Sequence, residues 1–431
     1  MPAKSKRNAK VVHYLAIRQF KKFKPYFPIT YFRNLNSPVR VTRLFKEFLD
    51  SEKAGGIILL VCTVISVSIA NSQWGSSYVD FWHRYADLSF ASVQLNYSIE
   101  HWINDGLMAI FFLLVGLEIE RELYAGELKD IKVAALPIAA AIGGMLIPAA
   151  IHFIFNQGTV NQSGFGIPMA TDIAFALGML ALLGNRVPFS LKIFLTALAI
   201  IDDLGAILVI ALFYNDGIAW IYLLSALGIF AGLLILGRLK VYNLLFYILP
   251  GIVMWYCMLK SGVHATITGV LLAFAIPFGG AGSKSLSYRL QRFLHKPVAF
   301  IILPIFALAN TGLILSDGWI NELTTNNSLG IILGLLVGKP AGILLFCFLL
   351  IKLKWGSLPT GISLKHLAGV GVLAGIGFTM SIFIANLAFK DAVTIQFSKI
   401  SVLAGSSLAC IAGLIWLRIT LKENKEEISV E

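Results

Sequence analysis

Four ionisable residues stand inside long apolar stretches of this chain, and they are the first candidates for chemistry. They are the adjacent pair Asp202 and Asp203, together with Asp172 and Lys339. Carboxylate oxygens suit a small hard cation, and no His or Cys stands with them at the middle of the membrane that would favour a transition metal. An apolar environment also makes a carboxylate hold its proton more tightly. A proton and a cation would therefore compete for the same oxygens, and such competition is the chemistry of ion exchange.

The spacing of these residues suggests separate roles. Neighbouring residues on a helix project about 100° apart, so one carboxylate of the Asp202-Asp203 pair can face an aqueous cavity while the other turns to a neighbouring helix. A buried lysine needs an anion to stay charged, so an Asp–Lys pair is expected. We favour Asp202 as the partner of Lys339 and Asp203 as the exposed ligand, although the residues alone leave the reverse assignment open.

Asp172 lies in a stretch that interrupts its helix, directly after Thr171. A carboxylate at such a break can neutralise the N-terminus of a half-helix. Alternatively, it can join the Thr171 oxygen in a cation site. Neutralisation is the favoured role.

The elements that must position these residues are membrane helices. The 431 residues are 57% hydrophobic and only 13% charged, with a mean hydropathy of +0.79, which lies outside the range of soluble globular proteins. Runs of about 20 apolar residues match the length that a helix needs to cross a bilayer. Soluble enzymes are therefore excluded. The four cysteines stand singly and predict neither a disulfide framework nor a metal site.

The chain is predicted to be an all-α polytopic membrane protein with about twelve transmembrane helices. The predicted segments are 55 to 71, 101 to 120, 134 to 156, 167 to 183, 192 to 213, 218 to 237, 241 to 258, 261 to 277, 294 to 315, 328 to 351, 366 to 389 and 397 to 417. Segments three to five and ten to twelve share a layout in which the middle helix is broken, at 168 to 171 and at 375 to 379. Because corresponding helices are seven apart, the two triplets run in opposite directions, as in the inverted repeats of secondary transporters.

The distribution of Lys and Arg predicts the orientation. Of the loop residues, fourteen fall on the side of the two termini and four (Arg84, Lys260, Lys390 and Lys399) on the other, so the termini are predicted to be cytoplasmic. Lys339 is the one left inside a segment.

The predicted domains are a basic N-terminal extension at 1–50, the twelve-helix domain at 51–420 and a cytoplasmic tail at 421–431. The extension is expected to lie on an anionic membrane surface; a targeting peptide or a disordered tail are the alternatives. Residues 88 to 99 alternate in polarity and predict a short external hairpin.

Several stretches resemble the bacterial sodium/proton antiporters of the NhaA type. They include Trp102-Ile-Asn-Asp-Gly-Leu-Met108, Gly116-Leu-Glu-Ile-Glu-Arg-Glu-Leu123, Ala170-Thr-Asp-Ile-Ala-Phe-Ala-Leu-Gly178, Ala197-Leu-Ala-Ile-Ile-Asp-Asp-Leu-Gly205, Ser261-Gly-Val-His-Ala-Thr266, Gly338-Lys-Pro340 and Gly375-Ile-Gly-Phe-Thr-Met-Ser381. The resemblance runs from about Ser51 to Arg418. It implies pH-regulated, electrogenic exchange of cytoplasmic Na⁺ or Li⁺ for external H⁺ by an inner-membrane homodimer that contacts membrane lipids. No cofactor is expected, and no nucleic-acid partner either, because the net charge of +12 is concentrated in residues 1 to 50.

The resemblance also implies roles for individual residues. Asp203 corresponds to the principal ion and proton carrier, Asp202 to the partner of Lys339, and Thr171 and Asp172 to broken-helix residues near the site. Accessory positions are implied for Asp105 and His264. The pH-sensing positions implied are Glu118, Arg121, Glu122 and His295. The chain departs from the family pattern at Gln291 and Arg292, where an acid and a histidine are expected, so its pH profile is predicted to be shifted or flatter.

Two other functions remain as alternatives. One is an antiporter of the same fold that prefers K⁺ or another cation, and the other is a membrane sensor that transports nothing. A purely structural role, in which the buried charges fix helix register, is a third interpretation of the same residues. No enzyme activity is predicted, because the chain has no intramembrane protease motif and Gly338-Lys339-Pro340 lacks the Ser or Thr of a phosphate-binding loop.

Overall fold

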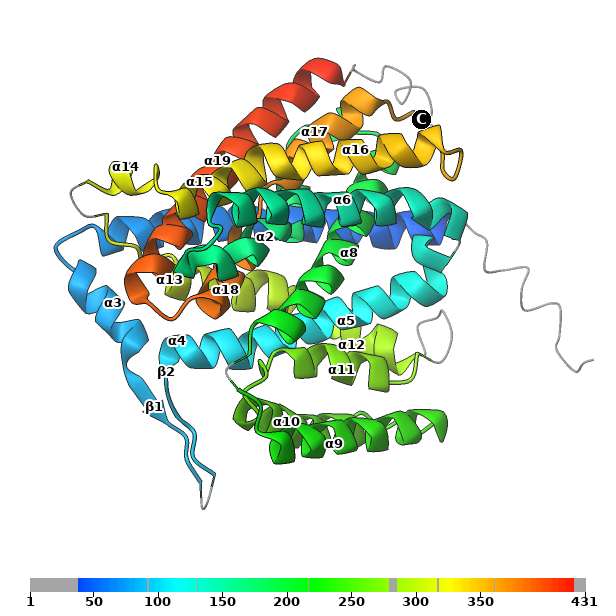
Figure 1. Cartoon of the computed structure of the whole chain (residues 1–431). Coiled ribbons are helices and arrows are strands. Elements are labelled where there is room, and N and C mark those ends of the chain that lie inside the picture. The colour runs from blue at the N-terminus through cyan, green and yellow to red at the C-terminus, as the bar shows by residue number, and fades with distance from the viewer. Residues whose placement is uncertain are drawn as a thin grey trace, which may run out of the picture. The chain divides into compact units, whose positions relative to one another are not determined.

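The computed structural model describes residues 38–90, 93–129, 131–215, 217–278, 285–315, 318–359 and 361–421 (Figure 1). The chain divides into two compact units, Met1–Phe48 and Leu49–Glu431. Of the first unit only the start of helix α2 is described, so most of the predicted N-terminal extension lies outside the described residues. The same holds for all but the first residue of the predicted tail. The fold below is that of the second unit.

The described chain is built almost entirely from helices. The elements of its first half are α2 (Pro38–Ala70), α3 (Gly75–His83), β1 (Tyr85–Asp87), β2 (Asn96–Ser98), α4 (Ile99–His101), the π-helical η2 (Trp102–Leu107), α5 (Met108–Ala125), η3 (Glu127–Lys129), α6 (Ile131–Phe155), the 3₁₀ helix η4 (Val160–Met169), α7 (Ile173–Ala181), η5 (Gly184–Arg186) and α8 (Phe189–Phe213).

The elements of the second half are α9 (Trp220–Arg238), α10 (Leu245–Lys260), α11 (Ile267–Ala275), α12 (Leu286–Pro297), η6 (Val298–Ile302), α13 (Leu303–Asn310), α14 (Trp319–Glu322), α15 (Asn326–Leu333), η7 (Gly334–Gly338), α16 (Lys339–Lys352), α17 (Leu364–Ala374), α18 (Phe378–Ala388) and α19 (Ala392–Thr420). Each of the twelve predicted segments coincides with one of these helices or with a run of adjoining ones. The all-α prediction is therefore confirmed.

In the part of the chain that the structure describes, fewer complete spans are found than the predicted twelve. Within the described residues, seven helices are long and apolar enough to cross a membrane, or up to ten if each sharply bent pair counts as one span. The difference lies between 241 and 277, where α10 has 16 residues and α11 has nine. Helix α11 is shortened because its predicted segment begins with the turn at Ser261–Thr266. At about 1.5 Å per residue, α11 covers less than half of the hydrocarbon core.

The two predicted repeats pack against each other through their first helices. α6, the first helix of one repeat, lies along α16, the second part of the corresponding span in the other (Figure 1). The backbones come close at Gly143 and Gly342, where a Cβ on either glycine would collide with the backbone of the other. Small residues permit this approach in membrane helices. The contact places Lys339, the first residue of α16, deep between the repeats.

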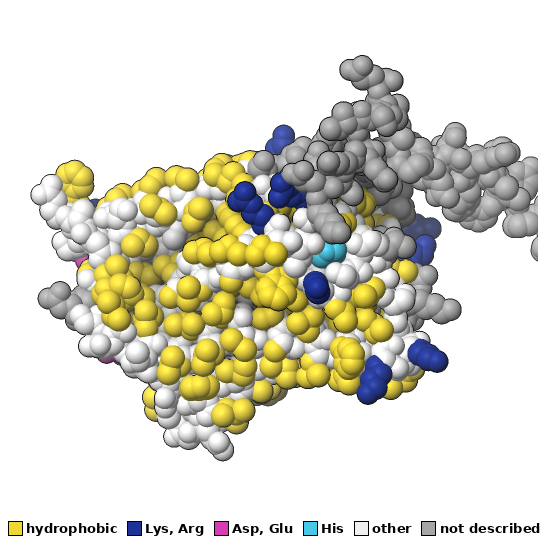
Figure 2. All heavy atoms as spheres, turned by 90° about the horizontal axis from the view of Figure 1, so that it is seen from above, with side chains coloured by type: hydrophobic (Ala, Val, Ile, Leu, Met, Phe, Trp, Pro, Cys, Tyr) yellow, Lys and Arg dark blue, Asp and Glu magenta, His cyan; other side chains and the backbone are white. Residues whose placement is uncertain are grey.

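The surface carries the hydrophobic side chains expected in a bilayer. Figure 2 shows a face covered largely by apolar side chains, with the Lys and Arg residues gathered towards one side of the view. Apolar residues on α9 and α10 are among the most exposed, including Ile221 (75%), Trp220 (64%) and Leu245 (62%). Such exposure would be unfavourable in water but is expected for helices that face lipid.

The predicted hairpin is present, with β2 inside the predicted range and β1 just before it. β1 pairs antiparallel with β2, with Tyr85 opposite Ser98, and Phe90 and Val93 form a further bridge. The backbone N–H of Ser89 donates to Asp87 Oδ1 at 2.9 Å, and hydrogen bonds from Ser89 lower the pKa of the Asp87 carboxyl. We call the end of the bundle where β2 leads into α4 the hairpin end.

Candidate functional site

The two broken helices meet at their breaks. η4 and α7 form one bent pair, with an angle of 42°, and α17 and α18 form the other, with an angle of 48°. The backbone N–H of Asp172 in one break donates to the carbonyl of Ile376 in the other at 2.7 Å. The first half of one pair is a 3₁₀ helix rather than the expected α-helix. The predicted breaks are therefore confirmed, and four helix ends point towards one buried place.

Asp172 caps both half-helices that begin at this place. Its Oδ1 accepts the backbone N–H of Phe175 at 3.0 Å, and its Oδ2 accepts the backbone N–H of Thr379 at 3.1 Å and the Thr379 hydroxyl at 2.5 Å. A carboxylate satisfies free N–H groups at a helix N-terminus and opposes the positive end of the helix dipole. The Asp172 carboxylate thus has the neutralising position that the sequence favours, and it serves α7 and α18 at once.

Lys339 and Asp202 form a fully buried ion pair. Lys339 Nζ lies 2.7 Å from Asp202 Oδ2, and neither side chain is exposed. Lys339 Nζ also donates to the Met169 carbonyl at the end of η4. The Thr171 hydroxyl donates to Asp202 Oδ2 at 2.8 Å and also lies 2.9 Å from the carbonyl of Ala374, at the end of α17. The geometry therefore has the pairing that the sequence favours, and it ties both half-helix C-termini to the same pair.

Asp203 is differently placed. Its side chain is buried rather than exposed as the sequence suggested, and Asp203 Oδ1 and Asp202 Oδ1 have no hydrogen-bond partner among the described residues. A buried polar atom without a partner is costly, so the two oxygens are suited to bind an ion or a proton. Thr171 and Asp172 have their side-chain oxygens occupied by protein contacts. Of the four predicted ligands, Asp202 and Asp203 are the two with oxygens to spare.

The predicted pH-sensing residues lie where α5 meets α12. Glu118 is buried on α5 and has Gln291 of α12 in hydrogen-bonding contact, and Arg121 pairs with Glu122 at 2.8 Å. His295 is half-buried on α12, and α12 packs against α5. These residues lie along one helix contact, and Glu118 is near enough to Asp203 for the two carboxyl groups to interact electrostatically.

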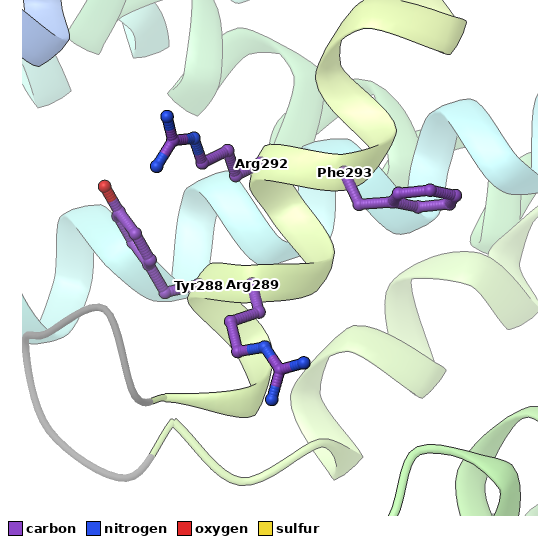
Figure 3. Close-up of a pocket in the computed structure, with 4 residues that line it drawn as sticks. All are labelled: Tyr288, Arg289, Arg292 and Phe293. Atoms are coloured by element: carbon purple, nitrogen blue, oxygen red, sulfur yellow. The ribbon is translucent and has the colours of Figure 1, made fainter.

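The departure at Arg292 changes the outer face of α12. A hollow of about 360 Å³ is lined by Tyr288, Arg289, Arg292 and Phe293. Figure 3 shows Tyr288 and Arg292 on one side of the helix and Phe293 on the other. The predicted sensor position 292 therefore holds a fixed positive charge at the surface, whereas Gln291 points to Glu118.

The accessory residues lie nearer the hairpin end. Asp105 Oδ2 lies 3.0 Å from His101 Nε2, one helical turn away, and the carbonyl of Asp105 accepts the indole N–H of Trp255 at 2.9 Å. His264 is half-buried in the connection between α10 and α11. His264 lies near enough to Asp105 for the two side chains to interact electrostatically.

Three residues of these sites were missed by the sequence analysis. Thr379 completes the cap with Asp172, and the break around it was the only available signal. Glu120 is buried and accepts the Ser287 hydroxyl at 2.9 Å, which its position between Glu118 and Glu122 could have indicated. Lys399 was counted as an external loop residue, and this is wrong: it lies within α19, and its side chain is 8% exposed.

The fold and this site define a class. Two broken helices, drawn from opposed repeats and crossing at buried carboxylates, are the architecture of secondary active transporters, in which irregular backbone at membrane depth lines the substrate site.

Comparison with known proteins agrees with this assignment to the secondary active transporters. The family model described as Na+/H+ antiporter 1 matches residues 46–417. The chain is 57% identical to a Na(+)/H(+) antiporter NhaA of Cytophaga hutchinsonii, over 89% of this chain and 97% of that protein. It is 56% identical to Na(+)/H(+) antiporter NhaA 1 of Flavobacterium johnsoniae, over 90% and 100%. It is 48% identical to the Na(+)/H(+) antiporter NhaA of Shigella dysenteriae, over 87% and 98%.

The chain therefore belongs to the Na⁺/H⁺ antiporter 1 family, and it is a multi-pass membrane transporter rather than an enzyme. The predicted family resemblance is confirmed. The roles of individual residues are not tested by these comparisons and stay predictions.

Proposed function

We propose that this protein exchanges cytoplasmic Na⁺ or Li⁺ for external H⁺, with Asp203 as the principal carrier. Membership of the family and the relatives named as Na⁺/H⁺ antiporters support the choice of ions. The observation that carries the mechanism is the pair of buried carboxylate oxygens, Asp202 Oδ1 and Asp203 Oδ1, without hydrogen-bond partners among the described residues. Oxygens of this kind bind either a hard cation or a proton.

Exchange follows from the competition for these two oxygens. A cation that binds between the adjacent carboxylates adds positive charge and displaces the protons held there, and protonation in turn removes the negative charge that holds the cation. Because the two groups are adjacent, their titrations are coupled and belong to the pair. If two protons leave for each Na⁺ that binds, one net charge moves per cycle, and the transport is electrogenic.

Lys339 keeps Asp202 in place during this competition. It holds Asp202 Oδ2 and the Met169 carbonyl together, so Asp202 Oδ1 stays directed away from the lysine. Thr171 and Asp172 hold the backbone of the crossing rather than the ion. In this proposal they position the site, and Asp203 with Asp202 binds the cargo.

We propose that the protein lies in the bacterial inner membrane with both termini cytoplasmic. The excess of Lys and Arg in the loops on one side supports this orientation, as does their position towards one side of the apolar face in Figure 2. The hairpin end is then external. By the same resemblance we propose a homodimer, with the β1–β2 hairpin as a candidate contact.

We propose that the α5–α12 contact adjusts activity to pH. Glu118, Glu120 and Glu122 lie on α5, and His295 lies on the facing helix. Because Gln291 and Arg292 cannot titrate near neutral pH, fewer groups change charge at this contact than the family pattern provides. The activity is expected to change less steeply with pH than in a relative that has an acid and a histidine at these positions.

The test is transport in everted membrane vesicles that lack other Na⁺/H⁺ antiporters. With a proton gradient reported by a pH-sensitive dye, Na⁺ and Li⁺ should each release protons from the lumen. Asp203→Asn should abolish the response. Asp391→Asn, the same chemical change at the exposed cap of α19, is the matched control and should leave it intact.

The alternatives give different outcomes. A response to K⁺ alone would identify an antiporter with another cation preference. No response to any cation in vesicles that contain the folded protein would favour the non-transporting sensor. Na⁺-dependent exchange that persists in Asp203→Asn would contradict the proposed site while leaving the proposed reaction intact.

A further inference from the structure

A second buried ion pair lies at the hairpin end. Lys399 Nζ of α19 lies 3.4 Å from Glu100 Oε1 of α4 and 3.3 Å from Asn310 Oδ1 at the end of α13. The other carboxylate oxygen of Glu100, Oε2, lies 3.2 Å from His83 Nε2, at the end of α3. A charged side chain inside a membrane-spanning helix is expensive and usually marks a pathway or a partner.

Asn310 joins this pair to two more elements. Its Oδ1 accepts the side-chain N–H of Asn386 on α18 at 2.7 Å, and its Nδ2 donates to Asn104 Oδ1 on η2 at 2.8 Å. Asn310 is 1% exposed. Side chains alone thus tie together five elements at this point, namely α4, η2, α13, α18 and α19, and α3 joins them through the exposed His83.

This point lies between the ion site and the hairpin end. Asn386 is seven residues beyond Thr379 on α18, which is about 10 Å along a helix. Lys399 is also seven residues from Ser406 on α19, and Ser406 Oγ accepts the backbone N–H groups of Gly377 and Phe378 in the second break at 3.2 and 3.1 Å. Two neighbouring helices therefore connect the crossing to the cluster over the same distance.

The cluster joins two groups of helices that carry different parts of the protein. α18 and α19 belong to the second repeat and hold the crossing, whereas α3, α4, η2 and α13 lie outside both repeats. The cluster lies where these two groups meet, on the hairpin-end side of the crossing. The Lys399 ammonium at that place repels cations, and its contacts hold the groups together.

We propose that Lys399, Glu100 and Asn310 form a gate that closes the ion pathway at the hairpin end. Opening requires α18 and α19 to separate from α4, η2 and α13, which breaks the Lys399–Glu100 pair and the contacts of Asn310. The inference rests on the proposed function, because a gate has a purpose only in a protein that exposes its site to each side in turn. The gate is closed in this structure.

The test measures access from each side of the membrane. Ala385→Cys, fully buried beside Asn386, is the reporter, in a chain whose four native cysteines are replaced by alanine. A membrane-impermeant maleimide is applied to right-side-out and to everted vesicles. In Lys399→Gln and in Glu100→Gln, labelling from the hairpin side should rise about fivefold, as for a modest shift between two states, while labelling from the other side should not rise.

Two variants separate a gate from a general loosening of the fold. Reversing the pair, with Glu100→Lys and Lys399→Glu together, should return the labelling towards that of the parent. Lys260→Gln removes another lysine at the hairpin end, one that contacts the Tyr97 hydroxyl at 3.2 Å, and should change nothing. Labelling that rises equally from both sides, or that stays unchanged in both single variants, overturns the proposal.

If the single variants fail to accumulate, Asn386→Ala, which strands no charge, should give a smaller rise from the hairpin side only.

Transport gives an independent readout. A loosened gate favours the state open to the hairpin end, so the KM for Na⁺ should fall on that side and rise on the other, because apparent affinity follows the population of the competent state. A variant that is merely unstable would lower the maximal rate without opposite changes in KM. If the parent shows no Na⁺-dependent exchange, the proposed function fails, and the labelling still decides whether the gate exists.

Discussion

The two buried lysine–carboxylate pairs have the same chemistry and different surroundings. Asp202 and Lys339 lie 2.7 Å apart with no exposure, and each has a further partner in Thr171 or Met169. Glu100 and Lys399 lie 3.4 Å apart, their side chains are 19% and 8% exposed, and Asn310 and His83 are their other contacts. The central pair is therefore expected to stay intact, whereas the longer and more exposed pair at the hairpin end is expected to separate more easily.

The difference teaches how position decides what a buried charge does. An ion pair out of water rarely stabilises a fold more than apolar packing would, but losing one partner is severely destabilising. At the crossing, the pair also satisfies the C-terminal end of a half-helix, so the backbone depends on it. At the hairpin end, the pair joins side chains only, and its loss leaves the backbone hydrogen bonds intact.

Exchanging the lysine and the carboxylate within each pair should give the largest difference in folding and stability between the two pairs. Asp202→Lys with Lys339→Asp should prevent folding or transport, because a carboxylate would then face the Met169 carbonyl. The corresponding reversal of Glu100 and Lys399 should yield folded protein. Detergent-solubilised protein analysed by size-exclusion chromatography and thermal unfolding would show this. A stable central reversal would mean that the carbonyl contact is unimportant.

Removing the central lysine comes next. Lys339→Ala strands the Asp202 carboxylate in the protein interior and should lower the free energy of unfolding by about 3–5 kcal/mol. The measurement is the melting temperature beside that of Lys365→Ala, an exposed lysine on α17. Equal melting temperatures for the two variants would rule out the structural importance of the Asp202–Lys339 pair.

Removing the charge at the hairpin end should cost less. Glu100→Gln leaves Lys399 with its contact to Asn310, and the pair is only partly buried because the Glu100 side chain is 19% exposed. We therefore expect a loss of about 1–2 kcal/mol, between the values for exposed and fully buried pairs. The same melting experiment, run beside Lys339→Ala, compares the two pairs directly. A loss as large as that of Lys339→Ala would show that both pairs are structural and would weaken the distinction between them.

The smallest effect is expected at Asp391, an exposed carboxylate that caps the helix carrying Lys399. Hydrogen bonds from the backbone N–H and hydroxyl of Thr394 lower the pKa of the Asp391 carboxyl. Because the folded pKa lies below the unfolded one, its stabilisation is complete above about pH 4 and is lost as the pH falls through the folded pKa. Asp391→Asn should therefore make the melting temperature slightly less dependent on pH in that range. An unchanged dependence would show that the cap contributes nothing.

Much of the architecture could be predicted from the sequence because hydrophobicity and helix breakers act locally. The runs of apolar residues predicted the helices, and Pro168 and Gly375 marked the positions of the two breaks. The prediction was least accurate between 241 and 277, where a turn at Ser261 shortens α11 without interrupting the apolar run. Hydropathy measures where a segment can lie, and it does not measure the length of its helix.

The sequence by itself determined that this is a membrane protein with charges at its centre, and it named Asp172, Asp202, Asp203 and Lys339, because an ionisable residue in an apolar run is visible without knowing its neighbours. Only the tertiary structure decided which oxygens are occupied and which are free. It also turned Lys399 from a loop residue into half of a buried pair. Partners such as Glu100 and Lys399 are 299 positions apart, and a contact over that distance depends on how the helices pack, which no local pattern records.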